Sequence, residues 1–581
     1  MQARQQRETA FSGTAAWSSG KKAGAAALLA LLAALLLNLG MPGLGKYSGW
    51  WPLLCLCLSP LLLIALSVPL RPAQAAAAGF LFGLAAYTGQ LYWIVIVLGR
   101  YGGLPLWLSV PALLLLAAYM ALYSALFCLL LSWLRQGIDE QASSGYPGFI
   151  YIWAPPLIWT GLDALRGALF TGFPWMDLGY GLFREPQLLL PADLGGHHLL
   201  SFCLVLINAV FTLFLSAARL RKPLWKTALP SLAAACSLLI GLSVYSLLRS
   251  VETKEEIAGA PKALIGLVQG NIEQDLKWSE EMKQATVERY LRHSAGLAAA
   301  GAALVVWPET ALPFYPQDDP LAGRVAAFAG AGTGTRLLTG APFYRVEDTE
   351  KGKVIHNFNG ALILGPQDKA GGGAVHGVYS KQHLVPFGEY IPLKNLLFFL
   401  KPLAESIGGF SAGQAKGPLF SDRLRVGVLI CYESIFPVIA RDTTALEANM
   451  LVNITNDAWY GRSSAPVQSL AMAVLRAVEN RRALVRSANT GISGFVDPLG
   501  RISGETAIFT EAAAAEQIPL LQSKTVFTRI GHYFGLLCAL LILPLALAGL
   551  LRSPGGNAGK PVQAAPAPSP AKRSAKKAGG S

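Results

Sequence analysis

The chain has 581 residues, of which 53% are hydrophobic and only 14% are charged. An average soluble domain has about 25% charged residues, so the composition indicates a membrane protein with more than one compact unit. The net charge of +14 does not indicate nucleic-acid binding, because Lys and Arg gather in the tail 553–581 and in short loops, with no basic stripe interleaved with aromatic residues.

Eight apolar runs approach the length of about 20 residues that a membrane-spanning helix needs. The basic segment 1–22 precedes them and is predicted to be a cytoplasmic tail, with the first run retained as an anchor because no convincing cleavage site follows. The region 23–250 contains seven predicted spans and the region 521–552 contains the last. The predicted spans are Ala23–Leu39, Trp51–Val68, Ala75–Leu98, Leu104–Leu134, Phe149–Phe170, Leu199–Ala218, Thr227–Leu248 and Ile530–Leu551.

The basic residues between these runs predict the orientation, because Lys and Arg are retained on the cytoplasmic side. With eight spans, the N-terminus, Arg135, the cluster 219–226 and the tail all fall on one side. The segment between spans seven and eight then lies on the extracytoplasmic side. One span more or fewer would reverse this prediction.

Residues 251–520 are predicted to form a water-soluble catalytic domain, because charged residues return and the apolar runs become short. Strands alternating with helices indicate a layered α/β domain. The run 467–484 is predicted to be a helix, with Arg476, Glu479, Arg481 and Arg482 available to a polar face. The Pro-, Ala- and Gly-rich tail 553–581 is predicted to be disordered. The expected strands are Ala263–Val268, Ala303–Trp307, Leu362–Leu364, Val426–Ile430 and Leu451–Ile454.

Cys431 is the candidate nucleophile, because the other six cysteines lie inside long apolar stretches. It directly follows the strand 426–430, where a strand-to-helix turn would hold the side chain clear of the sheet. This segment alone would favour a buried core thiol over a nucleophile. No cysteine pair outside the apolar runs has disulfide or metal-ligand spacing, so no zinc site and no other metal is expected.

Glu309 and Lys381 complete a chemically sensible set with Cys431. Glu309 follows the strand 303–307, although a carboxylate there can also cap a helix. Lys381 lies among apolar and aromatic residues, with Glu389 close behind it, although a lone lysine is usually a solvated charge. A thiol that attacks an ester needs a base and a positive group near the developing oxyanion, and these residues supply both.

These three residues, in this chain order, resemble the catalytic Glu, Lys and Cys of the nitrilase or carbon–nitrogen hydrolase superfamily. The motifs Trp307-Pro-Glu-Thr, Lys381-Gln-His-Leu-Val-Pro-Phe-Gly-Glu-Tyr and Cys431-Tyr-Glu-Ser, placed between seven spans and a last one, are similar to its membrane-embedded branch, the apolipoprotein N-acyltransferases. The resemblance covers most of residues 23–551. It implies eight transmembrane helices and a nitrilase-like αββα sandwich on the periplasmic side of a bacterial inner membrane.

The resemblance also implies a reaction without cofactor. An acyl chain passes from a phospholipid, usually phosphatidylethanolamine, to a thioester and then to the α-amine of a diacylglyceryl-cysteine apolipoprotein. Cys431 is then the nucleophile, Glu309 the base and Lys381 the stabiliser of the tetrahedral intermediate. The supporting residues that match family positions or flank the motifs are Glu389, Glu433, Trp278, Tyr432 and Asn359, the last preceded by Phe358 where the family often has Tyr.

Two other functions fit the same residues. A membrane-tethered amidase would hydrolyse a small soluble substrate with the same triad, and a transporter or scaffold could carry a decayed enzyme domain. Eight spans favour a lipid substrate over a simple anchor. Asp163 and Arg166 within a predicted span are either functional or an internal ion pair. His197 and His198 are adjacent, so on a helix they should point in different directions and form no zinc site.

Overall fold

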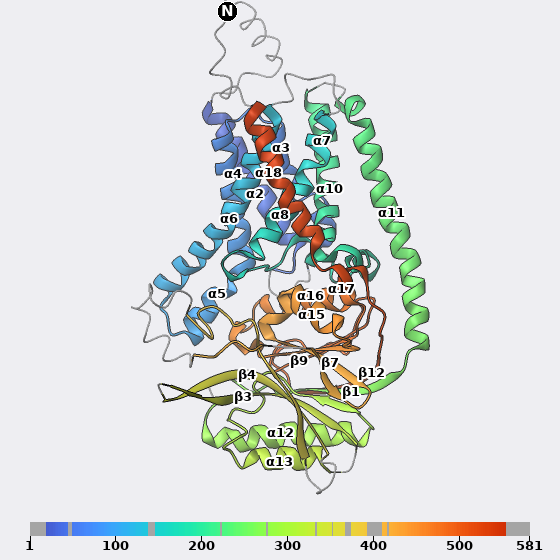
Figure 1. The fold of residues 1–581 in the computed structure, drawn as a ribbon. Helices are drawn as coiled ribbons and strands as arrows, with labels where there is room; N and C mark the ends of the chain where they lie inside the picture. Colours follow the sequence, from blue (N-terminus) through green and yellow to red (C-terminus); the bar gives the residue numbers. More distant parts are fainter. Residues whose placement is uncertain are drawn as a thin grey trace, which may run out of the picture.

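The computed structural model places a bundle of apolar helices against one side of an α/β domain (Figure 1). The structure describes residues 19–43, 49–136, 146–220, 224–274, 277–331, 334–350, 352–366, 373–391, 409–414 and 417–552. The predicted cytoplasmic tail 1–22 therefore lies mostly outside the described residues, and the predicted disordered tail 553–581 lies wholly outside them.

Five helices in the described part of the chain are long and apolar enough to cross a membrane. A sixth candidate consists of α4, Pro72–Leu91, and the continuation 93–101, which is bent by 49° from it. That continuation comprises α5, Trp93–Ile96, and η2, Val97–Tyr101. The five long helices are α2, Ser19–Gly40; α6, Leu106–Gln136; α10, Ala192–Leu220; α11, Leu224–Gly259; and α18, Tyr533–Arg552.

Two predicted spans are helical but interrupted. The run 51–68 contains η1, Trp51–Cys55, and α3, Ser59–Leu66, and the run 149–170 contains α7, Tyr146–Ile152, and α8, Ala154–Arg166. A proline lies near the start of α3, and two lie in the first turn of α8. Proline has no N–H to donate to the preceding helical turn, which explains why each run is divided into two helices. Short elements connect α8 to α10: η3, Leu169–Thr171; η4, Leu178–Leu182; and α9, Pro186–Leu189.

The α/β domain consists of two six-stranded sheets. The strand order is β12-β1-β2-β3-β4-β5 in one sheet and β11-β10-β9-β8-β7-β6 in the other. The central pairs β1–β2, β2–β3, β7–β8 and β8–β9 are parallel. Four of the five predicted strands fall within observed ones, and the fifth, 303–307, contains the shorter β2. The strands are β1, Lys262–Gln269; β2, Leu304–Val306; β3, Arg336–Thr349; β4, Gly352–Pro366; β5, Gly373–Ser380; β6, Leu419–Ser421; β7, Leu424–Ile430; β8, Met450–Thr455; β9, Leu484–Ala488; β10, Gly494–Val496; β11, Ile502–Ser503; and β12, Ala512–Pro519.

Helices cover the outer face of each sheet, giving four αββα layers (Figure 1). The helices α12, Glu280–Ala299, and α13, Leu321–Ala329, lie on the first sheet, away from the membrane helices. The helices α15, Pro437–Ala445, and α16, Ala465–Asn480, lie between the second sheet and the bundle. The short α17, Val526–Ile530, leads from this layer into α18. The second sheet therefore reaches the membrane helices through one layer of helix.

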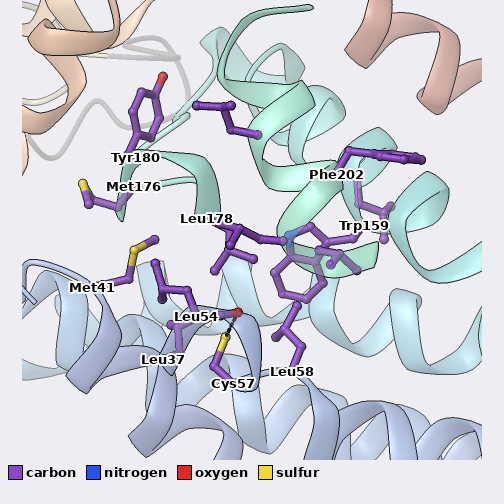
Figure 2. Packing of buried hydrophobic residues seen from close by; sticks show 14 of the residues in the cluster. Leu37, Met41, Leu54, Cys57, Leu58, Trp159, Met176, Leu178, Tyr180 and Phe202 are labelled. Atoms are coloured by element: carbon purple, nitrogen blue, oxygen red, sulfur yellow. Dashed lines mark hydrogen bonds between the residues drawn. The ribbon is translucent and has the colours of Figure 1, made fainter. Parts of the chain in front are cut away.

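The apolar core of the bundle continues into this intermediate layer. Buried residues of the bundle and of α16 belong to one hydrophobic cluster, and Figure 2 shows part of it, where Leu37 and Met41 lie near Leu54 and Leu178. A separate cluster fills the space between the two sheets. Because burial of apolar area is the main favourable contribution to packing, the continuous cluster fixes the α/β domain against the bundle.

The predicted polar face of α16 is wrong, because the helix is covered on both sides. Its charged residues are buried and paired: Arg476 with Glu479 at 2.9 Å, and Arg481, just after the helix, with Asp193 of α10 at 3.0 Å. Arg482 donates to the carbonyl oxygens of Ala448 and Ser523, each at 2.6 Å. These charged side chains therefore bind partners inside the protein and do not face solvent.

Candidate active site

Cys431 lies at the turn where β7 ends and the short helix η6, Cys431–Ile435, begins. Its φ of 52° is in the left-handed region, which a residue with a side chain seldom adopts. Such a turn sets the thiol apart from the strand direction, as the sequence predicts. Cys431 is half-buried and contacts the cluster between the sheets.

Glu309 follows β2 and is held by close main-chain packing. Trp307 before it is buried, stacks on Tyr290 at 5.0 Å and donates to Ser294 at 2.8 Å. A Cβ at Gly340 would come within 2.5 Å of the Pro308 oxygen, so only glycine allows β3 to pass this close. The carboxylate of Glu309 is 6% exposed and accepts from the Asn456 amide at 2.8 Å.

Lys381 follows β5 and brings its ammonium between two carboxylates. Its Nζ lies 2.9 Å from Glu389 Oε1 and 3.4 Å from Glu309 Oε1, and the residue is 1% exposed. Asn359 on β4 donates through Nδ2 to Glu309 at 2.7 Å and to Glu389 at 2.8 Å. Because both donors of that amide face carboxylates, Asn359 Oδ1 points elsewhere, and it has no hydrogen-bond partner among the described residues.

The directions of the pKa shifts favour a protonated Cys431 thiol beside an ionised Glu309 carboxylate. Burial raises the pKa of Cys431 well above that of an ordinary thiol, and the Glu309 charge adds to this effect, while Lys381 opposes it. The Lys381 charge therefore favours the thiolate, but burial outweighs its effect. Burial also opposes ionisation of Glu309, yet the Lys381 charge, the Asn359 hydrogen bond and the Lys277 charge hold the pKa of Glu309 below its usual value.

Glu433 orders the chain around the nucleophile. Its Oε2 accepts from the Ile430 amide at 2.8 Å and from the Tyr379 hydroxyl at 2.9 Å. Its Oε1 accepts from the amides of Gln382 at 2.6 Å and His383 at 3.2 Å. Glu433 thus ties the Cys431 turn to the segment that follows Lys381.

Tyr432 lies on the side of the turn that contacts the membrane helices. Its ring stacks near Phe173, with the centroids 6.5 Å apart, and meets Phe436 edge-on at 5.1 Å. Phe173 in turn stacks on Trp175 at 5.8 Å, in the loop between α8 and α10. The residue after the nucleophile is therefore packed against the membrane part of the chain.

Trp278 is 53% exposed and lies just before α12. The preceding residue, Lys277, is a part of this site that the sequence-based reasoning did not identify. Lys277 is 1% exposed, and its ammonium donates to the main-chain oxygen of Glu309 at 3.2 Å. Its position next to Trp278 was the only sequence signal available.

A second buried cluster of charges lies in the membrane part, at its boundary with α16. Arg166 pairs with Asp163 at 3.0 Å, and also with Asp177 and the Tyr87 hydroxyl. His197 lies between Asp177, at 2.9 Å, and Glu479 of α16, at 3.3 Å. The Asp163–Arg166 pair is therefore part of an internal ion-pair network that reaches the catalytic domain.

The prediction that His197 and His198 point in different directions is wrong. Gly196 has a φ of 69° and interrupts α10, so the two rings lie 4.0 Å apart between centroids. With Asp177 they could hold a metal ion, since their donor atoms lie within 4.8 Å of one another. However, Asp177 already pairs with Arg166, and a divalent cation there would face that guanidinium at low dielectric. A histidine bridging two carboxylates satisfies the same groups, so we interpret this cluster as an ion-pair network.

Two family models match the two parts of the chain. The N-terminal domain model of apolipoprotein N-acyltransferase matches residues 33–210, and the carbon–nitrogen hydrolase model matches residues 264–523. Among solved structures, an amidase from Nesterenkonia sp. AN1 is 19% identical with a TM-score of 0.32, covering 45% of this chain and 94% of its own. Saccharomyces cerevisiae Nit3, of the nitrilase superfamily, is 18% identical with a TM-score of 0.33, covering 44% and 90%.

Curated relatives extend over both parts of the chain. The apolipoprotein N-acyltransferase of Geobacter metallireducens is 39% identical over 88% of this chain and 92% of its own length. That of Chromobacterium violaceum is 33% identical over 89% and 94%. That of Pasteurella multocida is 32% identical over 84% and 90%. The chain therefore belongs to the apolipoprotein N-acyltransferase family of membrane acyltransferases.

Proposed function

We propose that this chain takes an acyl group from a phospholipid onto Cys431 and transfers it to the α-amine of a diacylglyceryl-cysteine apolipoprotein. The observation that carries the proposal is the meeting of Glu309, Lys381 and Cys431 at strand ends of the two sheets, where the residue after the nucleophile, Tyr432, packs against Phe173 of the membrane part. A soluble substrate would not require Tyr432 to contact the membrane part. A lipid ester can reach the thiol from that side.

In the first step, Glu309 takes the proton of the Cys431 thiol as sulfur attacks the ester carbonyl of the phospholipid. The raised pKa of Cys431 makes this base necessary, because little thiolate exists at neutral pH. The Lys381 ammonium stabilises the oxyanion. The C–O bond then breaks, the lysophospholipid oxygen takes the proton from Glu309, and the acyl group remains on sulfur.

In the second step, the α-amine attacks the thioester and an amide forms. Glu309 accepts the amine proton and returns it to the departing Cys431 sulfur, which restores the thiol. Water would hydrolyse the thioester, so the apolar surroundings of Tyr432 and Phe436 protect it.

We further propose eight crossings, by counting the interrupted pairs η1–α3 and α7–α8 as broken spans beside the five long helices and the bent one. The catalytic domain 251–520 then lies on the periplasmic side of the inner membrane, and the basic segments 1–22 and 553–581 in the cytoplasm. A cysteine introduced for Asp348, at the end of β3, should react with an impermeant maleimide in cells with a permeable outer membrane. One introduced for Ser574 should react only after lysis.

Mass spectrometry of the intact protein tests the acyl transfer. Incubation with phosphatidylethanolamine should add one acyl mass at Cys431, removable by hydroxylamine, and Cys431→Ala should not gain it. A diacylated lipopeptide with a free α-amine should then receive the chain, and an N-acetylated peptide should not. Absence of the thioester under every lipid condition would contradict the mechanism, and equal release of fatty acid with and without peptide would favour the amidase-like alternative.

A further inference from the structure

Lys277 is a buried cation without a carboxylate partner. It is 1% exposed, and no carboxylate of the described residues lies within 4.0 Å of its ammonium. Burial lowers the pKa of Lys277 to about 8, although the nearby Glu309 charge opposes this effect. Burying an ammonium in this way is costly, so a protein keeps it only where its charge has a use.

The segment containing Lys277 holds Glu309 from two directions. The ammonium donates to the Glu309 main-chain oxygen at 3.2 Å. Gln274, three residues earlier, accepts from the Asn456 side chain at 2.7 Å, and the Asn456 amide donates to the Glu309 carboxylate at 2.8 Å. The exposed Trp278 directly follows this double attachment.

Lys277 changes the balance of the charges next to the base, where Asp457, which also faces Glu309, is already paired with Arg486 at 2.8 Å and Glu433 lies on the other side of Lys381. Glu309 and Glu389 share the single positive charge of Lys381, which leaves one negative charge in excess. Lys277 supplies the missing positive charge, and its attraction, like that of Lys381, favours the carboxylate form of Glu309. Glu309 needs that form to accept a proton from the thiol.

We propose that Lys277 is a positioning residue for acyl transfer, which holds Glu309 ionised and fastens the Trp278 segment to the base. The proposal rests on the function proposed above. Lys277 acts through Glu309 and does not touch the reacting atoms. Lys277 thereby links the exposed Trp278 to Glu309, the residue that accepts the proton.

The test compares Lys277→Met, which keeps the length and removes the charge, with Lys277→Arg, which keeps the charge. Thioester formation at Cys431 is followed by intact mass with phosphatidylethanolamine in mixed micelles between pH 4 and pH 8. Without the Lys277 charge the pKa of Glu309 rises, so the acidic limb of the rate should move up by about one pH unit. The maximal rate should fall about tenfold, which is less than the loss of about a hundredfold or more expected when the proton-transfer group itself is removed.

The controls separate charge from folding. Lys277→Arg should leave the acidic limb in place, and Lys262→Met, at an exposed position of β1, should change nothing. Hydrogen exchange of residues 271–282, measured without lipid, should be faster in Lys277→Met than in the wild type. An unmoved acidic limb or unchanged exchange would overturn the role of Lys277, whereas a wild type that forms no thioester would contradict the proposed function itself.

Discussion

Two of the buried charge clusters in the described part of the chain differ in what they adjoin. Glu309, Lys381 and Glu389 form ion pairs beside the Cys431 thiol. The second cluster, around Arg166 and Glu479, joins side chains of the bundle to α16. We propose that the first cluster serves the chemistry, whereas the second holds the two parts of the chain together.

Glu309→Gln should give the largest effect on rate. The variant keeps the shape but removes the base, so thioester formation at Cys431 should fall about a thousandfold, within the range for general-base catalysis. Single-turnover acylation measures this loss. Glu288→Gln, at an exposed carboxylate of α12, is the matched control. A Glu309→Gln enzyme with near-normal rate would assign the base to another residue.

Arg476→Leu should affect stability instead of chemistry. Arg476 is fully buried and bonds Glu479, the Tyr180 hydroxyl and the Ile435 carbonyl, so its loss leaves a buried carboxylate and should cost about 3 kcal/mol. The fraction of protein that stays monodisperse after heating reports this cost. The control, Arg184→Leu, breaks an ion pair that is more than a third exposed on its arginine side and should cost under about 1 kcal/mol.

If Arg476→Leu instead lowered the rate of folded enzyme as strongly as Glu309→Gln, the distinction between the two clusters would fail. Its hydrogen bond to Ile435, at the end of the nucleophile turn, makes this a real test.

The pH dependence of Cys431 alkylation sharpens the electrostatic description. Because burial and the Glu309 charge raise the pKa of Cys431, iodoacetamide should react slowly at pH 8 in the wild type. Glu309→Gln removes a negative charge, which lowers the pKa of Cys431, so alkylation should become about tenfold faster while acylation is lost. Peptide mass spectrometry identifies the modified cysteine. Slower alkylation in the variant would contradict the inference that the Glu309 charge raises the pKa of Cys431.

Tyr379→Phe should have the smallest effect. It removes one of four hydrogen bonds to Glu433 and leaves the ring in place, so acylation should fall about three- to fivefold, equivalent to about 1 kcal/mol. Glu433→Gln, which sets an amide donor against main-chain amides, should have a larger effect. Equal acylation rates for the two variants would show that Glu433 contributes to the rate only through its hydrogen bond with Tyr379.

Much of the catalytic cluster was predictable because each residue follows a strand. Strand ends in a layered α/β domain meet at one edge, so Glu309 after β2, Lys381 after β5 and Cys431 after β7 come together from far apart in the chain. Apolar composition likewise predicted the long helices and the approximate positions of five strands. These features depend on local patterns of residues, and their physical causes act within short segments.

Three features depended on the tertiary structure alone. The charges of α16 suggested a solvent face, but packing between sheet and bundle buries them. Partners on other elements, among them Asp193 and Tyr180, offset the cost of this burial. The break at Gly196 brings His197 and His198 together against the helical expectation. No sequence pattern singled out Lys277, and only the fold places its ammonium against the main-chain oxygen of Glu309. The sequence alone determined which residues end the strands, and long-range packing decided which charges are buried and what they face.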